Sequence, residues 1–344
     1  MAVRLHPVPR GEGEDTVKAF VLRSYGSSDL LELSDLDEPV PARDEVLVRV
    51  LAASINPYDW HNMRGQPYVA RLMPGGLGLR GPKLRILGCD MAGQIVAVGQ
   101  NVTGFSPGDQ VYALLPQGGF AEYVSVPQSL LAPKPKNLSY EQAAAVPMAG
   151  ITALLGLRDQ GRLRTGQQVL VTGASGGVGT FAVQLARALG ADVTAVCSAP
   201  NAALVRSLGA AEVIDYTAQD FTRQGRHYDL LLDIAGSHRA QASVRALKPN
   251  GTFVAVGGPP GRWLQPAARI FAALALAPLI SQRVVLTDTV RSAEHNHHLA
   301  TLTELIEDGK VTPVIDRSYP FADIPAAVRY QERGHARGKV VITT

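Results

Sequence analysis

The stretch QVLVTGASGGVGTFAVQLARALG (Gln168–Gly190) decides the fold of this 344-residue chain. It begins with Val169–Thr172, a short apolar run of the kind that a fully buried parallel strand needs. The glycine-rich turn Gly173–Gly179 follows, and Phe181–Leu189 continues with apolar residues at helical spacing up to a final glycine. A strand, a glycine turn and a helix in this order present backbone N–H groups and a positive helix terminus to a pyrophosphate. The segment therefore predicts a dinucleotide site, with a tight turn that binds nothing as the alternative.

The composition is that of an ordinary globular protein. Hydrophobic residues make up 46% of the chain and charged residues 18%, and the length predicts about two domains. The formal net charge is only +3, and no basic cluster or stripe occurs, so we expect no nucleic-acid partner. The two cysteines, Cys89 and Cys197, exclude a disulfide framework and a CxxC zinc site, and they suit a reducing cytoplasm.

We expect neither a signal peptide nor a membrane anchor. Residues 1–16 have no apolar core and are interpreted as a flexible tail. The most apolar stretch, Ala267–Ile280, is too short to span a bilayer and contains Arg269 and Pro278. It is expected to be a helix that covers a core, an interface or the substrate pocket. A cytoplasmic location follows from these features.

Two sequence patterns alternate along the chain and predict two kinds of domain. Residues 17–138 contain many short strands broken by Pro and Gly, which indicates a partly closed barrel or sandwich. Residues 139–288 alternate strands with helices and predict a parallel, doubly wound α/β sheet, with a sixth strand near Val284. Residues 289–344 change pattern again and are expected to complete the first domain, so that the nucleotide domain is inserted in the sequence.

Six segments match one known family, in the family's order. They are Ile55–Gly65 (INPYDWHNMRG), Leu87–Gly99 (LGCDMAGQIVAVG), Gly118–Pro127 (GGFAEYVSVP), Val169–Ala186, Leu204–Tyr216 (LVRSLGAAEVIDY) and Gly338–Thr343 (GKVVIT). On these segments the chain resembles the medium-chain dehydrogenase/reductase superfamily, in its zinc-independent quinone oxidoreductase-like branch, and within it the reticulon-interacting-protein-like NADPH reductases. The resemblance implies a GroES-like β-rich domain around a Rossmann domain, an active site between them and a homodimer.

The ligands of a catalytic zinc are missing at the matching positions. Such a site needs about three protein ligands from thiolate, imidazole or carboxylate groups. Zinc-bearing members of the superfamily supply one from a Gly-His-Glu segment where residues 88–90 here read Gly-Cys-Asp, and residues 52–56 lack the usual first thiolate. The four-cysteine structural zinc lobe is also absent. The histidines at 295, 297 and 298 lie on an expected surface helix, where we interpret them as solvated. We therefore predict a metal-free enzyme.

The absence of a metal ion shapes the predicted chemistry. Alcohol oxidation becomes harder without an ion that polarises the oxygen. Reduction of a conjugated C=C bond or a quinone needs less activation. The negative charge spreads onto an enolate or hydroquinone oxygen, and a few hydrogen-bond donors are enough to stabilise it. The sequence thus predicts a zinc-independent, NADPH-dependent oxidoreductase acting on an α,β-unsaturated carbonyl compound or quinone. Two alternatives stay open: an enoyl or ketone reductase of a biosynthetic pathway, and a non-catalytic NADPH-sensing or RNA-binding protein on the same fold.

The choice of cofactor depends on the end of the second strand of the nucleotide domain. An Asp or Glu there binds the ribose hydroxyls of NAD and repels a 2′-phosphate. This strand is followed instead by Ser198, whose hydroxyl would donate to the phosphate. The resemblance implies that Tyr216 stands where related NADPH-dependent reductases use a tyrosine, although the Arg or Lys that relatives often carry near Ala199 is missing. NADPH is favoured over NADH.

Further cofactor contacts are expected at the carboxyl ends of the strands, where an open sheet binds its ligand. The glycine turn supplies Gly173, Ser175, Gly176, Gly177 and Val178. The resemblance further implies contacts from Thr152 near the nicotinamide, Ala235 after the fourth strand, Gly257 after the fifth strand and Lys339 in the last matching segment.

Three polar residues in the first matching segment are the candidate catalytic groups. Asn56, Asp59 and His61 lie in the segment that crosses the cleft in this superfamily. The alternatives are turn geometry for Asn56, a helix cap or buried hydrogen bond for Asp59, and a structural or surface position for His61. An imidazole near neutral pH can donate a proton or hydrogen-bond a substrate oxygen. Trp60 and Tyr68 would suit stacking on a flat substrate, with packing as the ordinary role.

Overall fold

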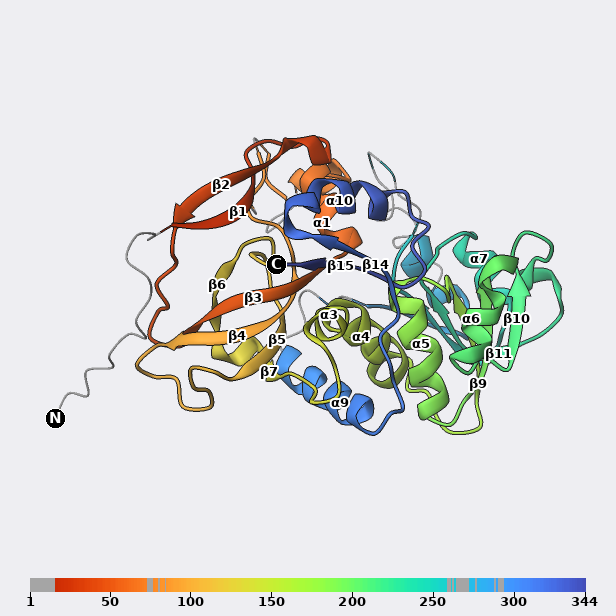
Figure 1. Cartoon of the computed structure of the whole chain (residues 1–344). Helices are drawn as coiled ribbons and strands as arrows, with labels where there is room; N and C mark the ends of the chain where they lie inside the picture. The colour runs from red at the N-terminus through yellow and green to blue at the C-terminus, as the bar shows by residue number, and fades with distance from the viewer. Residues whose placement is uncertain are drawn as a thin grey trace.

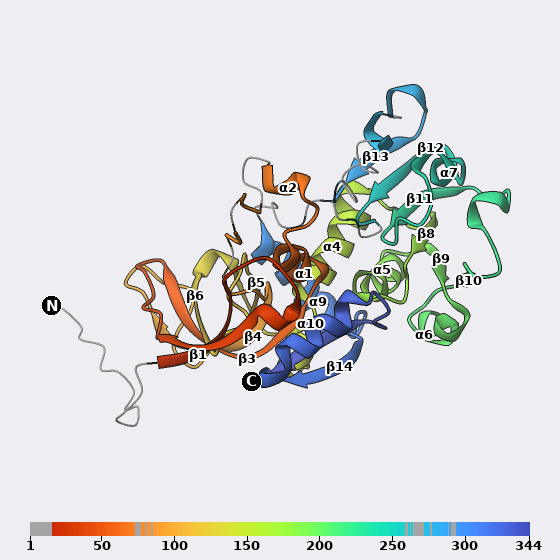
Figure 2. The same cartoon turned by 90° about the horizontal axis from the view of Figure 1, so that it is seen from above.

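The computed structural model describes residues 16–72, 77–79, 81–83, 85–258, 261, 263, 272–275, 277–287, 289 and 294–344. It contains a β-rich part and a parallel sheet side by side, with α4 (Pro147–Leu154) and α5 (Gly177–Ala188) near their boundary (Figures 1 and 2). The expected helix at 267–280 lies partly outside the described residues, and the expected tail lies outside them up to residue 15.

The nucleotide part is a six-stranded sheet with the order β10-β9-β8-β11-β12-β13. Every neighbouring pair is parallel. This order confirms the predicted doubly wound Rossmann sheet, including the sixth strand. The strands are β8 (Gln168–Thr172), β9 (Asp192–Cys197), β10 (Glu212–Asp215), β11 (Tyr228–Asp233), β12 (Leu247–Ala255) and β13 (Arg283–Leu286).

Helices cover the parallel sheet because their apolar faces need burial. In α5, Phe181 and Leu185 are fully buried and belong to the main core, together with Val169 and Val171 of β8. Pro147 occupies the first turn of α4, where its missing N–H costs no hydrogen bond. A π-helical turn follows α4, and the other short helices of this part are α6 (Ala202–Ser207) and α7 (Ala240–Arg245).

The β-rich part joins strands from both ends of the chain. Its sheet has the order β14-β15-β3-β4-β5-β7, with β6 paired to β3, and β1 and β2 form a separate antiparallel pair. The strands are β1 (Thr16–Leu22), β2 (Leu31–Asp37), β3 (Glu45–Ile55), β4 (Asp90–Val98), β5 (Gln110–Leu114), β6 (Tyr123–Pro127), β7 (Leu131–Pro133), β14 (Ile315–Pro320) and β15 (Lys339–Thr343). Because β15 pairs antiparallel with β3, it brings Lys339 beside the segment that follows Ile55. The domain boundaries at 16, 138 and 288 stay predictions.

The helices of this part are α1 (Pro57–Arg64), α2 (Val69–Leu72), α3 (Tyr140–Ala144), α9 (His295–Glu307) and α10 (Ile324–Glu332). The structure corrects one expectation on α9. His295 and His298 are buried, not solvated, and only His297 of the three is exposed. Nε2 of His295 lies 2.8 Å from the carbonyl oxygen of Thr289, and Nδ1 of His298 lies 3.2 Å from the guanidinium of Arg158. The helix turns this face inward, because Leu299 and Leu302 on the same face join the core.

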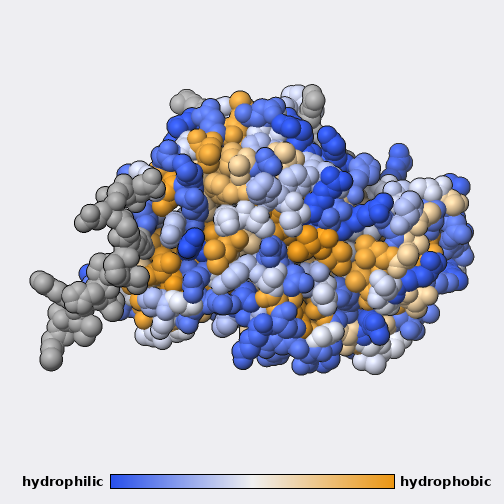
Figure 3. Space-filling model, viewed as in Figure 1, coloured by the Kyte–Doolittle hydropathy of each residue, from blue (hydrophilic) through white to orange (hydrophobic). Residues whose placement is uncertain are grey.

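On the face shown in Figure 3, polar residues surround apolar patches that lie over the middle of the molecule and over the β-rich part. Within the described ranges, each helix is either too short or too polar to cross a bilayer.

Candidate active site

The glycine turn has the geometry of an anion site. Gly176 precedes α5 in an extended conformation, and Gly177–Gly179 form the first helical turn, whose N–H groups have no partner inside the helix. A Cβ atom on Gly179 would lie 2.2 Å from the carbonyl oxygen of Gly173, so only glycine allows the helix to approach β8 this closely. The turn therefore directs unpaired N–H groups and the positive end of a 12-residue helix to one point.

A side-chain clamp fixes the neighbouring strand ends. The hydroxyl of Thr172, at the end of β8, donates to Asp233 Oδ1 over 2.7 Å. The hydroxyl oxygen of Thr172 also accepts from the backbone N–H of Ala235 at 3.2 Å, and Ala235 lies beside Gly173. Gly257 passes so close to the carbonyl of Ile234 that a Cβ would lie 2.7 Å from it. The predicted contacts Ala235 and Gly257 thus share one edge of the sheet with the turn. Sequence reasoning missed the Thr172–Asp233 clamp.

A second group of predicted contacts meets at the end of β9. The side-chain amide of Asn201 donates to Ser175 Oγ at 3.1 Å and to Ser198 Oγ at 3.2 Å. Because both hydroxyl oxygens accept from this amide, each serine keeps its own proton for another partner. Tyr216 lies alongside, with its N–H donated to the carbonyl of Cys197 and its side chain 57% exposed. Asn201 was not predicted; its position three residues after Ser198, just before a helix, is the only local signal.

A buried carboxylate joins the two parts of the chain. Asp90, at the start of β4, is fully buried and accepts four hydrogen bonds. The donors are Ser54 Oγ at 2.7 Å, Asn56 Nδ2 at 2.9 Å, the N–H of Met148 at 2.8 Å and Lys339 Nζ at 3.1 Å. Since Met148 belongs to α4 and the others to the β-rich part, Asp90 ties both parts together at the site.

Internal hydrogen bonds occupy the side chains of two predicted catalytic residues. The amide nitrogen of Asn56 donates to Asp90 and to Cys89 Sγ, and its oxygen accepts from Lys339. Asp59 accepts from the N–H of Asn56 at 2.8 Å and from that of Gly88 at 2.9 Å, so it completes the capping box of α1, whose N-cap is Asn56, and makes the buried hydrogen bond named as an alternative role. Burial raises the pKa of Asp59 to about 7. A role in positioning the site fits both residues better than direct contact with substrate.

His61 hydrogen-bonds a backbone carbonyl oxygen and not the groups around Asp90. Its Nδ1 is 3.1 Å from the carbonyl oxygen of Gln66, and its ring stacks on Trp60 with 3.7 Å between ring centres. A carbonyl oxygen only accepts, so Nδ1 carries the proton and Nε2 of the neutral ring is an acceptor. Burial lowers the pKa of His61 and favours this neutral form. Proton donation from Nε2 therefore requires the imidazolium.

Lys339 connects the glycine turn to the buried cluster, and Thr152 lies on the helix that carries Met148. The stem of Lys339 passes the turn, because a Cβ on Gly177 would lie 3.0 Å from its Cδ, while its ammonium group reaches Asp90. Thr152 donates to the carbonyl of Met148 at 2.6 Å and bonds the hydroxyl of Thr289 at 2.7 Å. Lys339 thus lies between the helix terminus and the groups around Asn56, while Thr152 follows Met148, a donor to Asp90, by one turn of α4.

Comparison with known proteins establishes the family. NAD(P)H oxidoreductase RTN4IP1, mitochondrial, of Bos taurus is 35% identical, over 94% of this chain and 88% of its own length. The chain belongs to the medium-chain dehydrogenase/reductase superfamily, in its quinone oxidoreductase-like branch. Within this superfamily, the NADPH-dependent alkenal/one oxidoreductase, chloroplastic, of Arabidopsis thaliana is 34% identical, over 95% of this chain and 79% of its own length.

Domain models and a solved structure agree with this assignment to the medium-chain dehydrogenase/reductase superfamily. Residues 42–136 match the alcohol dehydrogenase GroES-like domain, and residues 208–342 match the model described as zinc-binding dehydrogenase. The quinone oxidoreductase from Coxiella burnetii has a TM-score of 0.81 and 29% identity, over 96% of this chain and 99% of that one. The predicted GroES-like and Rossmann folds are confirmed, and the chain is an oxidoreductase with a nicotinamide cofactor.

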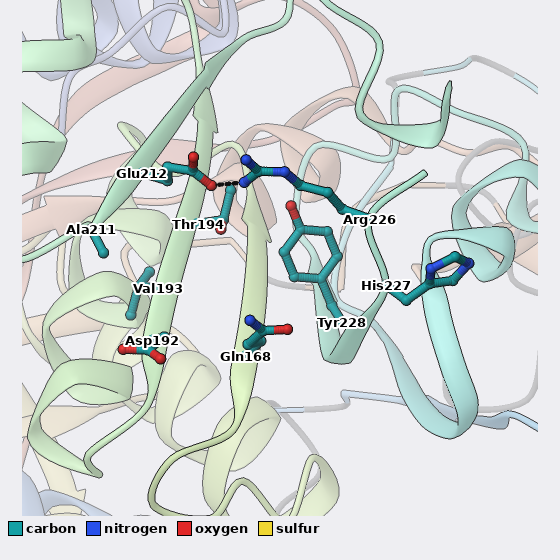
Figure 4. Close-up of a pocket in the computed structure, with 9 residues that line it drawn as sticks. All are labelled: Gln168, Asp192, Val193, Thr194, Ala211, Glu212, Arg226, His227 and Tyr228. Carbon is teal, nitrogen blue, oxygen red and sulfur yellow. Dashed lines mark hydrogen bonds and ion pairs between the residues drawn. The ribbon is translucent and has the colours of Figure 1, made fainter. Parts of the chain in front are cut away.

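A cavity at the opposite edge of this dehydrogenase/reductase sheet is not the nucleotide site. It opens at the amino ends of β8 to β11, below the ion pair of Arg226 with Glu212 (Figure 4). Tyr228 stands in the middle of this close-up. The glycine turn lies at the carboxyl ends of the same strands, where the superfamily's open sheet binds its ligand.

Proposed function

We propose that this protein is a zinc-independent NADPH oxidoreductase that transfers hydride to an α,β-unsaturated carbonyl compound or a quinone. The observation that carries the proposal is the position of the Lys339 ammonium group, which hydrogen-bonds both Asp90 and Asn56. A catalytic zinc ion needs ligand groups that are free to bind it, and in zinc-dependent relatives the segments that match these residues supply such ligands. The names of the alkenal/one and quinone oxidoreductases among the similar proteins support the acceptor class.

The donors around Asp90 do not fit a catalytic zinc ion. Burial raises the pKa of the Cys89 thiol well above its usual value, which opposes the thiolate form that zinc needs. Asp90 already pairs with a buried cation. Among the residues that the structure describes, no three His, Cys, Asp or Glu side chains are grouped to hold a metal. Elemental analysis of active protein should find no stoichiometric zinc; one zinc per chain, with activity lost on chelation, would refute this.

The residues present fit the nicotinamide dinucleotide, which supplies the hydride when bound. The N–H groups of Gly177–Gly179 would hold the pyrophosphate, and the Thr172–Asp233 clamp keeps the strand ends around it in place. Ser175 and Ser198 would donate to a 2′-phosphate. As an acceptor oxygen gains negative charge, the nearby Lys339 ammonium adds a positive potential, and the proton comes from solvent or from the His61 imidazolium.

The central test is a panel of enones, quinones, aldehydes and ketones assayed with NADPH and with NADH. We expect rapid oxidation of NADPH with at least one enone or quinone and little reaction with simple ketones. Tight NADPH binding without turnover across the panel would favour a sensor on the same fold. Turnover confined to simple ketones or aldehydes would favour a ketone reductase.

Replacing Ser198 with aspartate should move cofactor preference away from NADPH. The new carboxylate would face the 2′-phosphate, and like charges brought together cost several kcal/mol. We expect the ratio of kcat/KM for NADPH to that for NADH to fall at least about tenfold. Ser207→Asp, which adds the same charge at an exposed position on α6, is the matched control. An unchanged ratio in Ser198→Asp means that the phosphate assignment is wrong.

We also infer a homodimer in the cytoplasm. β13 is the edge strand of the six-stranded sheet, and its half-buried Val284–Leu286 would pair with the same strand of a second copy. Sedimentation should give the mass of two chains, and the mass of one chain would refute the dimer. The buried cysteines suit a reducing compartment, whereas the relatives' names include mitochondrial and chloroplastic forms. Cell fractionation tests the location.

A further inference from the structure

An exposed tryptophan follows the last strand residues of β12 in the parallel sheet. Trp263 comes after Gly257 in the chain, in the segment that leaves the carboxyl end of β12. Its side chain is 71% exposed, although tryptophans are mostly buried in folded proteins. An exposed aromatic ring in a segment that follows the carboxyl end of a parallel strand is a candidate for ligand contact, because open sheets bind their ligands outside these strand ends.

Trp263 contacts the β-rich part of the chain through Tyr68. The two ring centres are 5.1 Å apart, and the ring planes are nearly perpendicular at 89°. The N–H of Val69, the first residue of α2, donates to the carbonyl of Trp263 at 3.3 Å. An edge-to-face pair leaves ring area uncovered, and the exposure of Trp263 shows that its ring is open to a ligand.

Tyr68 is a rigid partner because a guanidinium group is fixed between it and Tyr25. The guanidinium carbon of Arg71 lies 4.7 Å from the centre of the Tyr68 ring and 4.1 Å from that of Tyr25. Arg71 also donates to the carbonyl of Gly65 at 2.7 Å. The same turn after α1 supplies the carbonyl that binds His61 Nδ1, so one turn positions both His61 and Tyr68.

We propose that Trp263 and Tyr68 form an aromatic platform on which a flat, aromatic acceptor stacks, so that Trp263 determines specificity for aryl enones and quinones over small alkyl enones. This inference rests on the proposed function and names the substrate class for the same site. Both parts of the chain contribute to the platform, which places the acceptor at their junction.

The test compares benzalacetone, an aryl enone, with methyl vinyl ketone, a small alkyl enone, using NADPH. In Trp263→Ala, the ratio of kcat/KM for the aryl enone to that for the alkyl enone should fall about tenfold, chiefly because KM for the aryl enone rises. A tenfold change corresponds to the upper end of the range for the loss of one aromatic stacking contact. Trp263→Phe keeps an aromatic face and should retain most of the ratio. Leu33→Ala, which removes a 50% exposed apolar side chain on β2, should leave the ratio unchanged.

The possible outcomes separate this inference from the proposed function. An unchanged ratio in Trp263→Ala overturns the platform, while turnover by the wild type upholds the proposed function. If kcat/KM falls equally for both acceptors and the sedimentation mass changes, Trp263 belongs to a contact between two copies of the chain. This result also overturns the platform. If Trp263→Ala does not fold by circular dichroism, the same ratio measured in Tyr68→Leu decides. Failure of the wild type on both acceptors refutes the proposed function itself.

Discussion

Replacing Gly179 with alanine is expected to abolish NADPH binding. The added Cβ would lie 2.2 Å from the carbonyl oxygen of Gly173 and 2.6 Å from backbone atoms of Ala174. These atoms belong to the backbone of the turn and cannot rotate away, so the start of α5 must move off β8. The movement would displace the N–H groups to which we assign the pyrophosphate. We expect calorimetry to show a dissociation constant raised at least about 100-fold, which corresponds to about 2.7 kcal/mol.

Alanine substitutions at two other glycines serve as controls for Gly179→Ala, because they show whether replacing a glycine weakens binding in general. Gly104 has no atom within 4 Å of a Cβ, so Gly104→Ala should bind NADPH as the wild type does. At Gly176 a Cβ would meet only the carbonyl oxygen of Gly173, at 3.5 Å. Gly176→Ala should therefore fold normally, and any weaker binding would report the close approach of the cofactor. Wild-type affinity in Gly179→Ala would contradict the assignment of the turn.

The nucleotide fold was predictable because its signals are local. The apolar run of β8, the glycine turn and the helical period of α5 follow one another within Gln168–Ala188, and each has one dominant structural meaning. The same reasoning found β13, a strand of four residues. The expectation that Ser175, Ser198 and Tyr216 lie near the ends of parallel strands came from the rule that these ends meet at one edge; their contacts with the cofactor stay predictions.

The buried cluster was not predictable from the sequence, because its partners are distant in the chain. Asp90 meets Ser54, Met148 and Lys339 across separations of 36, 58 and 249 residues. A single polar residue at the start of an apolar strand carries no periodic signal. The burial of the α9 histidines did have a signal: His295 and His298 share helical spacing with Leu299 and Leu302, and only their polarity argued for solvent.

Replacing Lys339 with methionine is expected to be the most destabilising single change at the site. Lys339 and Asp90 are 3% and 0% exposed, so the variant leaves a buried carboxylate without its cation. Breaking a buried ion pair by removing one partner costs about 3–5 kcal/mol. Chemical denaturation should show the free energy of unfolding lowered by that amount, with a lower midpoint and the same dependence on denaturant concentration.

The double variant Asp90→Asn with Lys339→Met tests whether the unpaired charge is the cause. Without a buried carboxylate, it should recover part of the stability that Lys339→Met loses, and a double-mutant cycle would measure the coupling. Lys310→Met, which breaks an exposed pair with Asp308, should change stability by less than about 1 kcal/mol. If Lys339→Met costs no more than Lys310→Met, the buried pair with Asp90 does not stabilise the fold. Because the Lys339 stem also borders Gly177, NADPH affinity measured in the folded double variant would separate cofactor contact from stability.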